Sequence, residues 1–253
     1  MMPLALARSE TTKLLTARPL WILALVTVLG TWPMAWTNAV SSAGLELDDP
    51  RLFSAEPVPL EYQGFEMAGF GGVLLLAFAA VWAGSEYGSG RQIRTTLLAT
   101  PQRMRVFVMK AALLAVIVAV IGFVTMWGTV VITHLGAETG VDPWALTPAI
   151  WANLGGVTLA WSLTALIVFA VGTLARTAIL PLILLTPLVV GIGDFLAGFW
   201  EGAKYLPVVA GAALYGDPTS GILLTPVLGG LVQAGWAVLL LSAAALVFVR
   251  RDL

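Results

Sequence analysis

The feature that most constrains this chain is a series of six apolar blocks, each at least 19 residues long and almost free of charge. A helix of about 20 apolar residues is long enough to cross a hydrocarbon core of roughly 30 Å. Within lipid, only helices and closed barrels satisfy every backbone hydrogen bond, and the alternating pattern of barrel strands is absent from this sequence. We therefore expect an all-α integral membrane protein with six transmembrane helices, at residues 19–40, 67–85, 111–133, 150–174, 177–199 and 222–249.

The composition supports the bilayer as the solvent and argues against several functions. Hydrophobic residues make up 59% and charged residues 11% of the chain, against about 45–50% and about 25% in soluble domains. The net charge of -1 lacks the basic excess that nucleic-acid binding needs, so no nucleic-acid partner is expected. The chain has no cysteine and one histidine, His134, and we predict neither a metal site nor catalytic residues.

The positions of the basic residues indicate an orientation for the spans, because Lys and Arg accumulate in cytoplasmic loops. With both termini in the cytoplasm, that side holds eleven of the 13 basic residues, namely Arg8, Lys13, Arg18, Arg91, Arg94, Arg103, Arg105, Lys110, Arg176, Arg250 and Arg251. The outer loop at 41–66 instead carries Glu46, Asp48, Asp49, Glu56, Glu61 and Glu66. We predict a multi-pass protein of the plasma membrane with cytoplasmic termini.

Two further segments have patterns of their own within what we expect to be a single domain over 1–253. Residues 1–18 place several apolar side chains on one helical face and turn Glu10 and Lys13 away, although Leu6 interrupts the pattern. This predicts an interfacial helix. The stretch 206–215 is apolar but too short to cross, so the segment 201–221 predicts a short outer helix or re-entrant element, with a partly buried loop as the alternative.

The loop at 86–110 contains helix-breaking residues on both sides of a stretch that is compatible with a helix. Gly88 and Gly90 break the helix that leaves the membrane, residues 92–100 are compatible with a short helix, and Pro101 ends it. Such a short helix is unstable alone in water, so it needs a partner surface. The alternative is that the five basic residues of this loop only anchor the chain to anionic lipid headgroups.

Residues 86–87, 91, 93–101 and 103 resemble the corresponding loop of six-span permeases of ABC exporters of the second type, the bacterial drug and polysaccharide export family. Residues 172–178 after the fourth span are similar to the same family's pattern. The resemblance implies a coupling helix at 92–100 that sits in a groove of a separate ATP-binding subunit, and it makes residues 1–18 the family's connecting helix. The implied ATPase-coupling residues are Glu86, Arg91, Arg94, Thr95, Leu97, Leu98, Pro101 and Arg103.

The energy source is expected to lie outside this chain. A phosphate-binding loop of the form G-x-x-x-x-G-K-[ST] needs a lysine after a glycine, and none of the three lysines follows one. We therefore expect no cofactor here, with ATP and Mg²⁺ on two copies of a cytoplasmic ATP-binding subunit, and a second permease chain, identical or related. The expected function is export of a hydrophobic or amphipathic drug, antibiotic, peptide or lipid. The chain itself is not expected to be an enzyme.

Three polar residues inside the spans are candidates for the substrate pathway. Asp194 lies toward the outer end of the fifth span, where it would favour cationic cargo or simply reach outer water together with Glu201. Asn153 and Gln233 are expected to form hydrogen bonds between helices. A six-span secondary transporter or channel, and an intramembrane enzyme, are the alternative functions; the enzyme would have only His134 as an imidazole base.

Overall fold

The computed structural model describes residues 8–13, 16–43, 58–87, 102–137, 142–217 and 223–250. These residues form helices, turns and connections, with no strand among them. Six stretches are long and apolar enough to cross a membrane, namely Arg18–Ser42, Leu60–Gly84, Arg103–Gly136, Pro148–Ala175, Ile179–Phe199 and Pro226–Arg250. The predicted all-α fold with six membrane-spanning helices is therefore confirmed.

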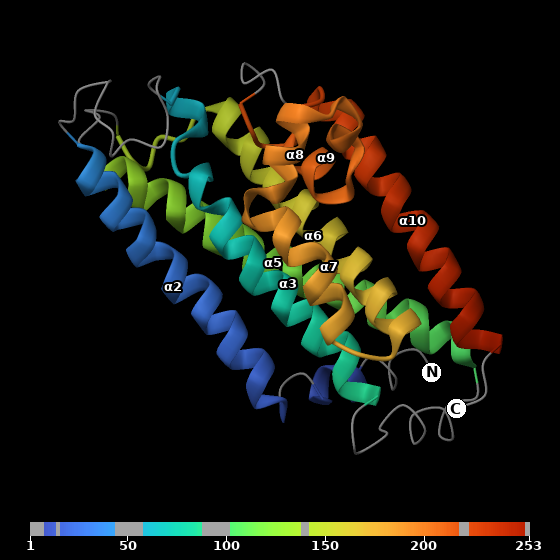
Figure 1. The fold of residues 1–253 in the computed structure, drawn as a ribbon. Coiled ribbons are helices and arrows are strands. Elements are labelled where there is room, and N and C mark those ends of the chain that lie inside the picture. The colour runs from blue at the N-terminus through green and yellow to red at the C-terminus, as the bar shows by residue number, and fades with distance from the viewer. Residues whose placement is uncertain are drawn as a thin grey trace.

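The helices have the following bounds in chain order: α2 (Arg18–Ser42), η1 (Leu60–Tyr62), η2 (Phe65–Met67), α3 (Ala68–Gly84), η3 (Ser85–Tyr87), α5 (Arg103–Gly136), α6 (Pro148–Ala175), α7 (Ile179–Pro187), η4 (Leu188–Ile192), α8 (Gly193–Phe199), η5 (Glu201–Tyr205), α9 (Pro207–Ala212) and α10 (Pro226–Arg250). Figure 1 shows that the longest of them run side by side as a bundle.

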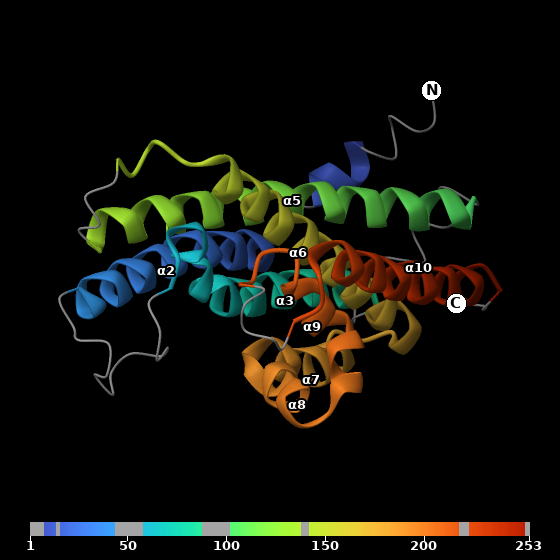
Figure 2. The same cartoon turned by 90° about the horizontal axis from the view of Figure 1, so that it is seen from above.

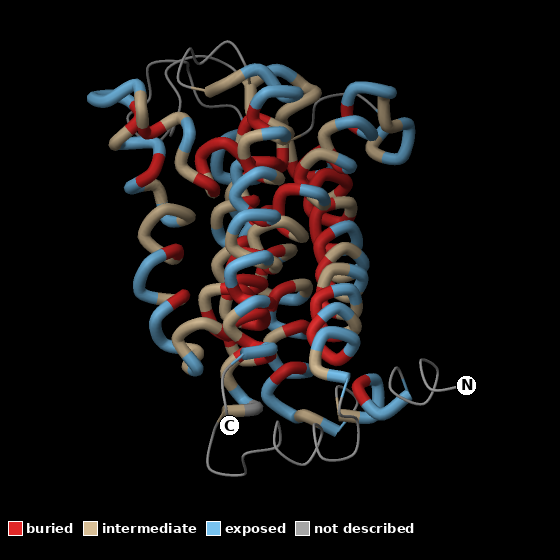
Figure 3. Tube along the Cα trace, turned by 90° about the vertical axis from the view of Figure 1, so that its right-hand side faces the viewer, coloured by how far each residue is buried: buried red, intermediate tan, exposed pale blue. Residues whose placement is uncertain are grey.

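Helix α6 occupies the middle of this bundle. It packs against α3, α5, α7, α9 and α10, whereas α2 packs against α3 and α5 at one side. Figure 2 shows α7 and α8 together on the opposite side from α2 and α5. The buried stretches in Figure 3 face inward, and exposed stretches run along the outside of the helices. Many of the exposed side chains are large and apolar, and an exterior of this kind suits lipid as the surrounding solvent.

The two ends of the bundle differ, and we name them for what lies there. The loop end holds residues 8–13, η3, the start of α5 and the end of α10. The α9 end holds η1, α8, η5 and α9, and α9 packs against α10, α6 and α8.

Helix α5 is longer than the apolar pattern predicts, with 34 residues against a predicted span at 111–133. The pattern stops at the basic residues Arg103, Arg105 and Lys110, but these are good helix formers and the helix continues through them. No proline interrupts α5.

The fifth span, predicted as one helix at 177–199, is broken. Helix α7 ends at Pro187, a π-helical segment follows as η4, and α8 begins at Gly193. Pro187 has no N–H to donate, and Gly191 adopts φ 110°, a left-handed conformation that favours glycine. The chain therefore changes direction within the span.

Segment 201–221 contains the 3₁₀ helix η5 and the six-residue helix α9, and residues 213–216 after α9 form a turn and a bend. Its depth in the membrane stays a prediction. The N-terminal segment is helical at 8–13. Here one expectation was wrong: Glu10, predicted on the outward face, is fully buried. A basic partner on another helix makes this burial possible, as described below.

Candidate functional site

The predicted coupling residues fall mostly outside the described residues, which omit 88–101. This applies to Arg91, Arg94, Thr95, Leu97, Leu98 and Pro101. Glu86 belongs to η3, where the loop leaves α3, and Arg103 is the first residue of α5, where the loop ends. The coupling helix at 92–100 therefore stays a prediction, and the described geometry concerns the two helices that flank it.

Arg103 connects the start of α5 to the end of α10. Its Nη1 donates a hydrogen bond of 3.2 Å to the backbone oxygen of Val249, in the last turn of α10. The final carbonyl groups of a helix have no partner within the helix, and a guanidinium group is well suited to satisfy them. Arg103 thus joins the loop to the last span, a contact that the sequence did not indicate.

A buried cluster of charges lies beside the loop, and sequence reasoning missed it. Glu10 accepts hydrogen bonds from Lys13, at 2.8 Å, and from Lys110 of α5, at 2.5 Å. The Lys110 ammonium also lies 5.7 Å from the centre of the Trp82 ring, near the end of α3. Glu10 is 0% and Lys110 4% exposed. The cluster therefore ties the N-terminal segment to both helices that flank the loop.

The charges in this cluster compensate one another. Burial alone would raise the pKa of Glu10, but the ammonium groups of Lys110 and then Lys13 outweigh it, so the pKa lies below its usual value. Glu10 is therefore an anion at neutral pH. One sequence signal could have indicated the cluster: Glu10 is the only acidic residue before Glu46, in an otherwise basic terminal segment.

We expect the N-terminal segment to loosen only in acid. Because the folded-state pKa of Glu10 is lowered, its contribution to stability is complete above the unfolded value and is lost as the pH falls through the folded value. Hydrogen-exchange protection factors for residues 8–13 should stay constant from neutral pH to about pH 5 and fall below about pH 4. A loss of protection near neutral pH, or the same profile in the Glu10→Gln variant, would contradict this prediction.

A second candidate site is a pocket of about 750 Å³ toward the α9 end, between α3, α6, η4, α8, α9 and α10. Ligand-binding pockets commonly have volumes of about 300–1,000 Å³. The pocket brings together two of the three predicted pathway residues, Asp194 and Gln233. Asn153 is not among its lining residues and instead donates a 2.9 Å hydrogen bond to the backbone oxygen of Glu61 in η1.

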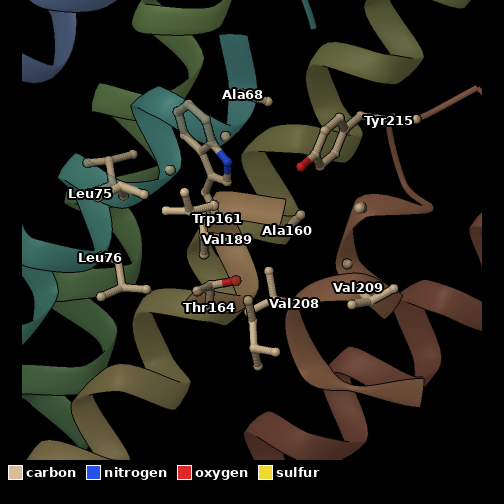
Figure 4. A pocket seen from close by; sticks show the side chains of 18 of the residues that line it. Ala68, Leu75, Leu76, Ala160, Trp161, Thr164, Val189, Val208, Val209 and Tyr215 are labelled. Atoms are coloured by element: carbon tan, nitrogen blue, oxygen red, sulfur yellow. The ribbon is translucent and has the colours of Figure 1, made fainter. Parts of the chain in front are cut away.

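Two aromatic side chains shape this pocket. Figure 4 shows Trp161 of α6 and Tyr215, which follows α9, on either side of its upper part. The Trp161 indole fits against α3 because Gly71 has no side chain, and a Cβ there would lie 2.7 Å from the ring. Burial, and then the charge of Asp194, raises the pKa of Tyr215. Its phenol therefore stays protonated and can donate a hydrogen bond.

Gln233 forms the interhelical hydrogen bonds that its position in the sixth span indicated. Its Nε2 donates to the backbone oxygen of Ala160 and to Oγ1 of Thr164, both at 3.0 Å and both on α6. The side chain also lies directly against Gly211 of α9, where a Cβ would overlap the amide. One side chain thus holds α10, α6 and α9 together at the pocket.

Comparison with known protein families gives a match over most of the chain. The family model described as ABC-2 family transporter protein matches residues 6–193. The matched region contains Glu10, the loop and the first four spans, and it ends one residue before Asp194. No curated protein sequence matches the chain.

Proposed function

Because the chain belongs to the ABC-2 transporter family, as a permease subunit in the membrane, we propose that it exports a hydrophobic or amphipathic substrate, driven by a separate ATPase. The substrate would be a drug, antibiotic, peptide or lipid. The family match favours this function over a six-span secondary transporter or channel. Membership of the family also implies an ATP-binding partner, and this partner is the component that would bind ATP and Mg²⁺.

The single observation that carries the coupling role is the buried cluster of Glu10, Lys110 and Trp82. It connects the N-terminal segment to α3, which precedes the loop, and to α5, which follows it. Packed side chains and ion pairs of this kind can carry coupling between elements. A cytoplasmic partner that pushes on the loop would therefore act on two spans and the N-terminal segment at once.

The complex would contain two ATP-binding subunits and two permease chains. Large apolar side chains on α2 and α7, among them Trp21, Leu25, Ile183 and Leu184, are exposed in the single chain. Such faces suit lipid or a second permease chain. ATP would close the two partner subunits, draw the two loops together and open the path outward, and hydrolysis would reset it. In this arrangement both termini and the loop are cytoplasmic.

The direct test is co-expression with a candidate ATPase, followed by co-purification and measurement of ATP hydrolysis in nanodiscs. We expect a stable complex with substrate-stimulated hydrolysis. The double variant Arg94→Glu, Leu97→Pro removes a positive charge from the expected coupling helix and breaks it. It should lose at least about nine-tenths of the stimulation, the effect of about 1.4 kcal/mol in coupling, while inserting normally into the membrane.

A matched control carries the same chemical changes in the expected outer loop, as Arg51→Glu, Leu52→Pro. This control should keep its stimulated hydrolysis. The absence of any complex would count against the permease function, and full stimulation in the Arg94, Leu97 variant would count against the coupling helix.

A further inference from the structure

The pocket at the α9 end contains a buried hydrogen-bond acceptor without a partner. The Nε2 of Gln233 donates a hydrogen bond to the Ala160 carbonyl oxygen. Because a carbonyl oxygen can only accept, this contact identifies the nitrogen and the oxygen of the Gln233 amide. The other end, Oε1, has no hydrogen-bond partner among the described residues, and Gln233 is 0% exposed. Gln233 is also one of the residues that line the pocket.

An unpaired acceptor of this kind needs an explanation, because leaving one buried costs about 1–3 kcal/mol. The volume of about 750 Å³ can admit water or a ligand. Because Gln233 is 0% exposed, an N–H or O–H group of a ligand reaches Oε1 once the side chains around the amide shift to admit it. A ligand without a donor displaces water and leaves the acceptor unpaired, so Gln233 selects for a donor.

The charge of the pocket is equally selective. Its described lining includes two carboxylates, Glu66 and Asp194, and no basic side chain. Glu66 accepts a hydrogen bond from the backbone N–H of Gly64. Asp194 has no hydrogen bond or ion pair within the described part of the chain, and it is an exposed residue of the pocket lining. A carboxylate in this position attracts a cation.

Most of the remaining lining is apolar, and Trp161 adds an aromatic surface. A flat ring fits beside an indole, and a cationic ring gains further attraction from it. We propose that this pocket within one chain binds an amphipathic aromatic cation, with its ring beside Trp161, an N–H or O–H group bonded to Gln233 and its charge toward Asp194. This inference rests on the proposed export function, for which it names the substrate class.

The test uses the full chain in nanodiscs without an ATPase, so that it does not depend on the motor. The probe is ethidium, a planar cation with two amino groups, and the neutral comparison is 2-aminoanthracene. Binding is followed by fluorescence anisotropy. Gln233→Met should weaken both ligands roughly two- to tenfold through the lost hydrogen bond. Asp194→Asn should weaken ethidium about two- to fivefold and leave 2-aminoanthracene unchanged.

The control variant Glu201→Gln removes a carboxylate at the same end of the bundle but outside the pocket lining, and it should bind both ligands normally. The chain has no cysteine, which gives a second readout that does not alter Gln233. Ethidium should slow alkylation of Val208→Cys, in the pocket, and not of Val227→Cys, which is 75% exposed and outside it.

Unsaturable ethidium binding, equal affinity in the Asp194→Asn and unaltered chains, or no protection at position 208 would each overturn the inference. These outcomes are separate from those of the co-purification test. A pocket that binds ethidium in a chain that recruits no ATPase would contradict the permease function alone. Substrate-stimulated hydrolysis with an inert pocket would contradict this inference alone.

Discussion

Replacing Glu10 with alanine should lower the free energy of unfolding by about 3 kcal/mol, because it removes the carboxylate that pairs with the buried Lys110 ammonium. Lys110 is 4% exposed and extends toward Glu10 and the face of Trp82. The Trp82 ring compensates only part of a full charge. The measurement is equilibrium unfolding of the purified chain in detergent, with the thermal midpoint as a second readout.

The matched control for this prediction is Ser9→Ala, one residue away and exposed, which should change the free energy of unfolding by less than about 0.5 kcal/mol. The double variant Glu10→Leu, Lys110→Met removes both charges and should recover most of the loss. A single Glu10→Ala variant as stable as the unaltered chain would show that the pair does not hold the segment in place. Equal losses in the single and double variants would show that the charges are not the cause.

Adding one methyl group at Gly156 should destabilise the chain by about 1–3 kcal/mol, whereas the same change at Gly155 should not. A Cβ at Gly156 would overlap the backbone oxygen of Leu214, in the turn that follows α9. Beyond the neighbouring residues and backbone of α6 itself, no atom of the described residues lies within 4 Å of a Cβ at Gly155. Gly155→Ala should therefore keep or slightly increase stability, since alanine favours a helix by up to about 1 kcal/mol.

The Gly156→Ala change should also affect the pocket, because Leu214 precedes Tyr215, which lines it. A displaced turn moves the Tyr215 wall, so we expect weaker ethidium binding in Gly156→Ala and unchanged binding in Gly155→Ala. The same unfolding measurement and anisotropy titration serve both variants. Two glycine variants with the same stability would mean that α9 does not rest against α6 as closely as described.

The pair Gly155 and Gly156 illustrates what the sequence could predict. The apolar blocks depend on local composition, and they placed all six spans within a few residues of most observed helix ends. Which glycine contacts α9 depends on the rotation of α6 about its own axis, which neighbouring helices set. Local composition carries little of that information.

Glu10 also shows that local sequence does not reveal contacts with distant helices. Its helical face predicted exposure, since an isolated amphipathic segment turns charged residues toward water. The partner that reverses this expectation is 100 residues away, on α5. For Gln233, in contrast, the sequence-based prediction was correct. A polar residue in an apolar span needs a hydrogen-bond partner, and a neighbouring helix is the partner within reach. Asn153 found a backbone partner in η1 and so lies outside the pocket.

The unbroken length of α5 has a mechanical consequence. Its 34 residues span about 51 Å at about 1.5 Å per residue, and it has no proline or π-helical segment at which to bend. A tilt of about 5° about its Arg103 end would shift the other end by about 4 Å over that length. The fifth span, with its break at Gly191, would absorb a comparable push as a change of angle. The chain thus combines one continuous helix, α5, which would transmit a tilt along its whole length, with one interrupted span, which would change its angle at the break.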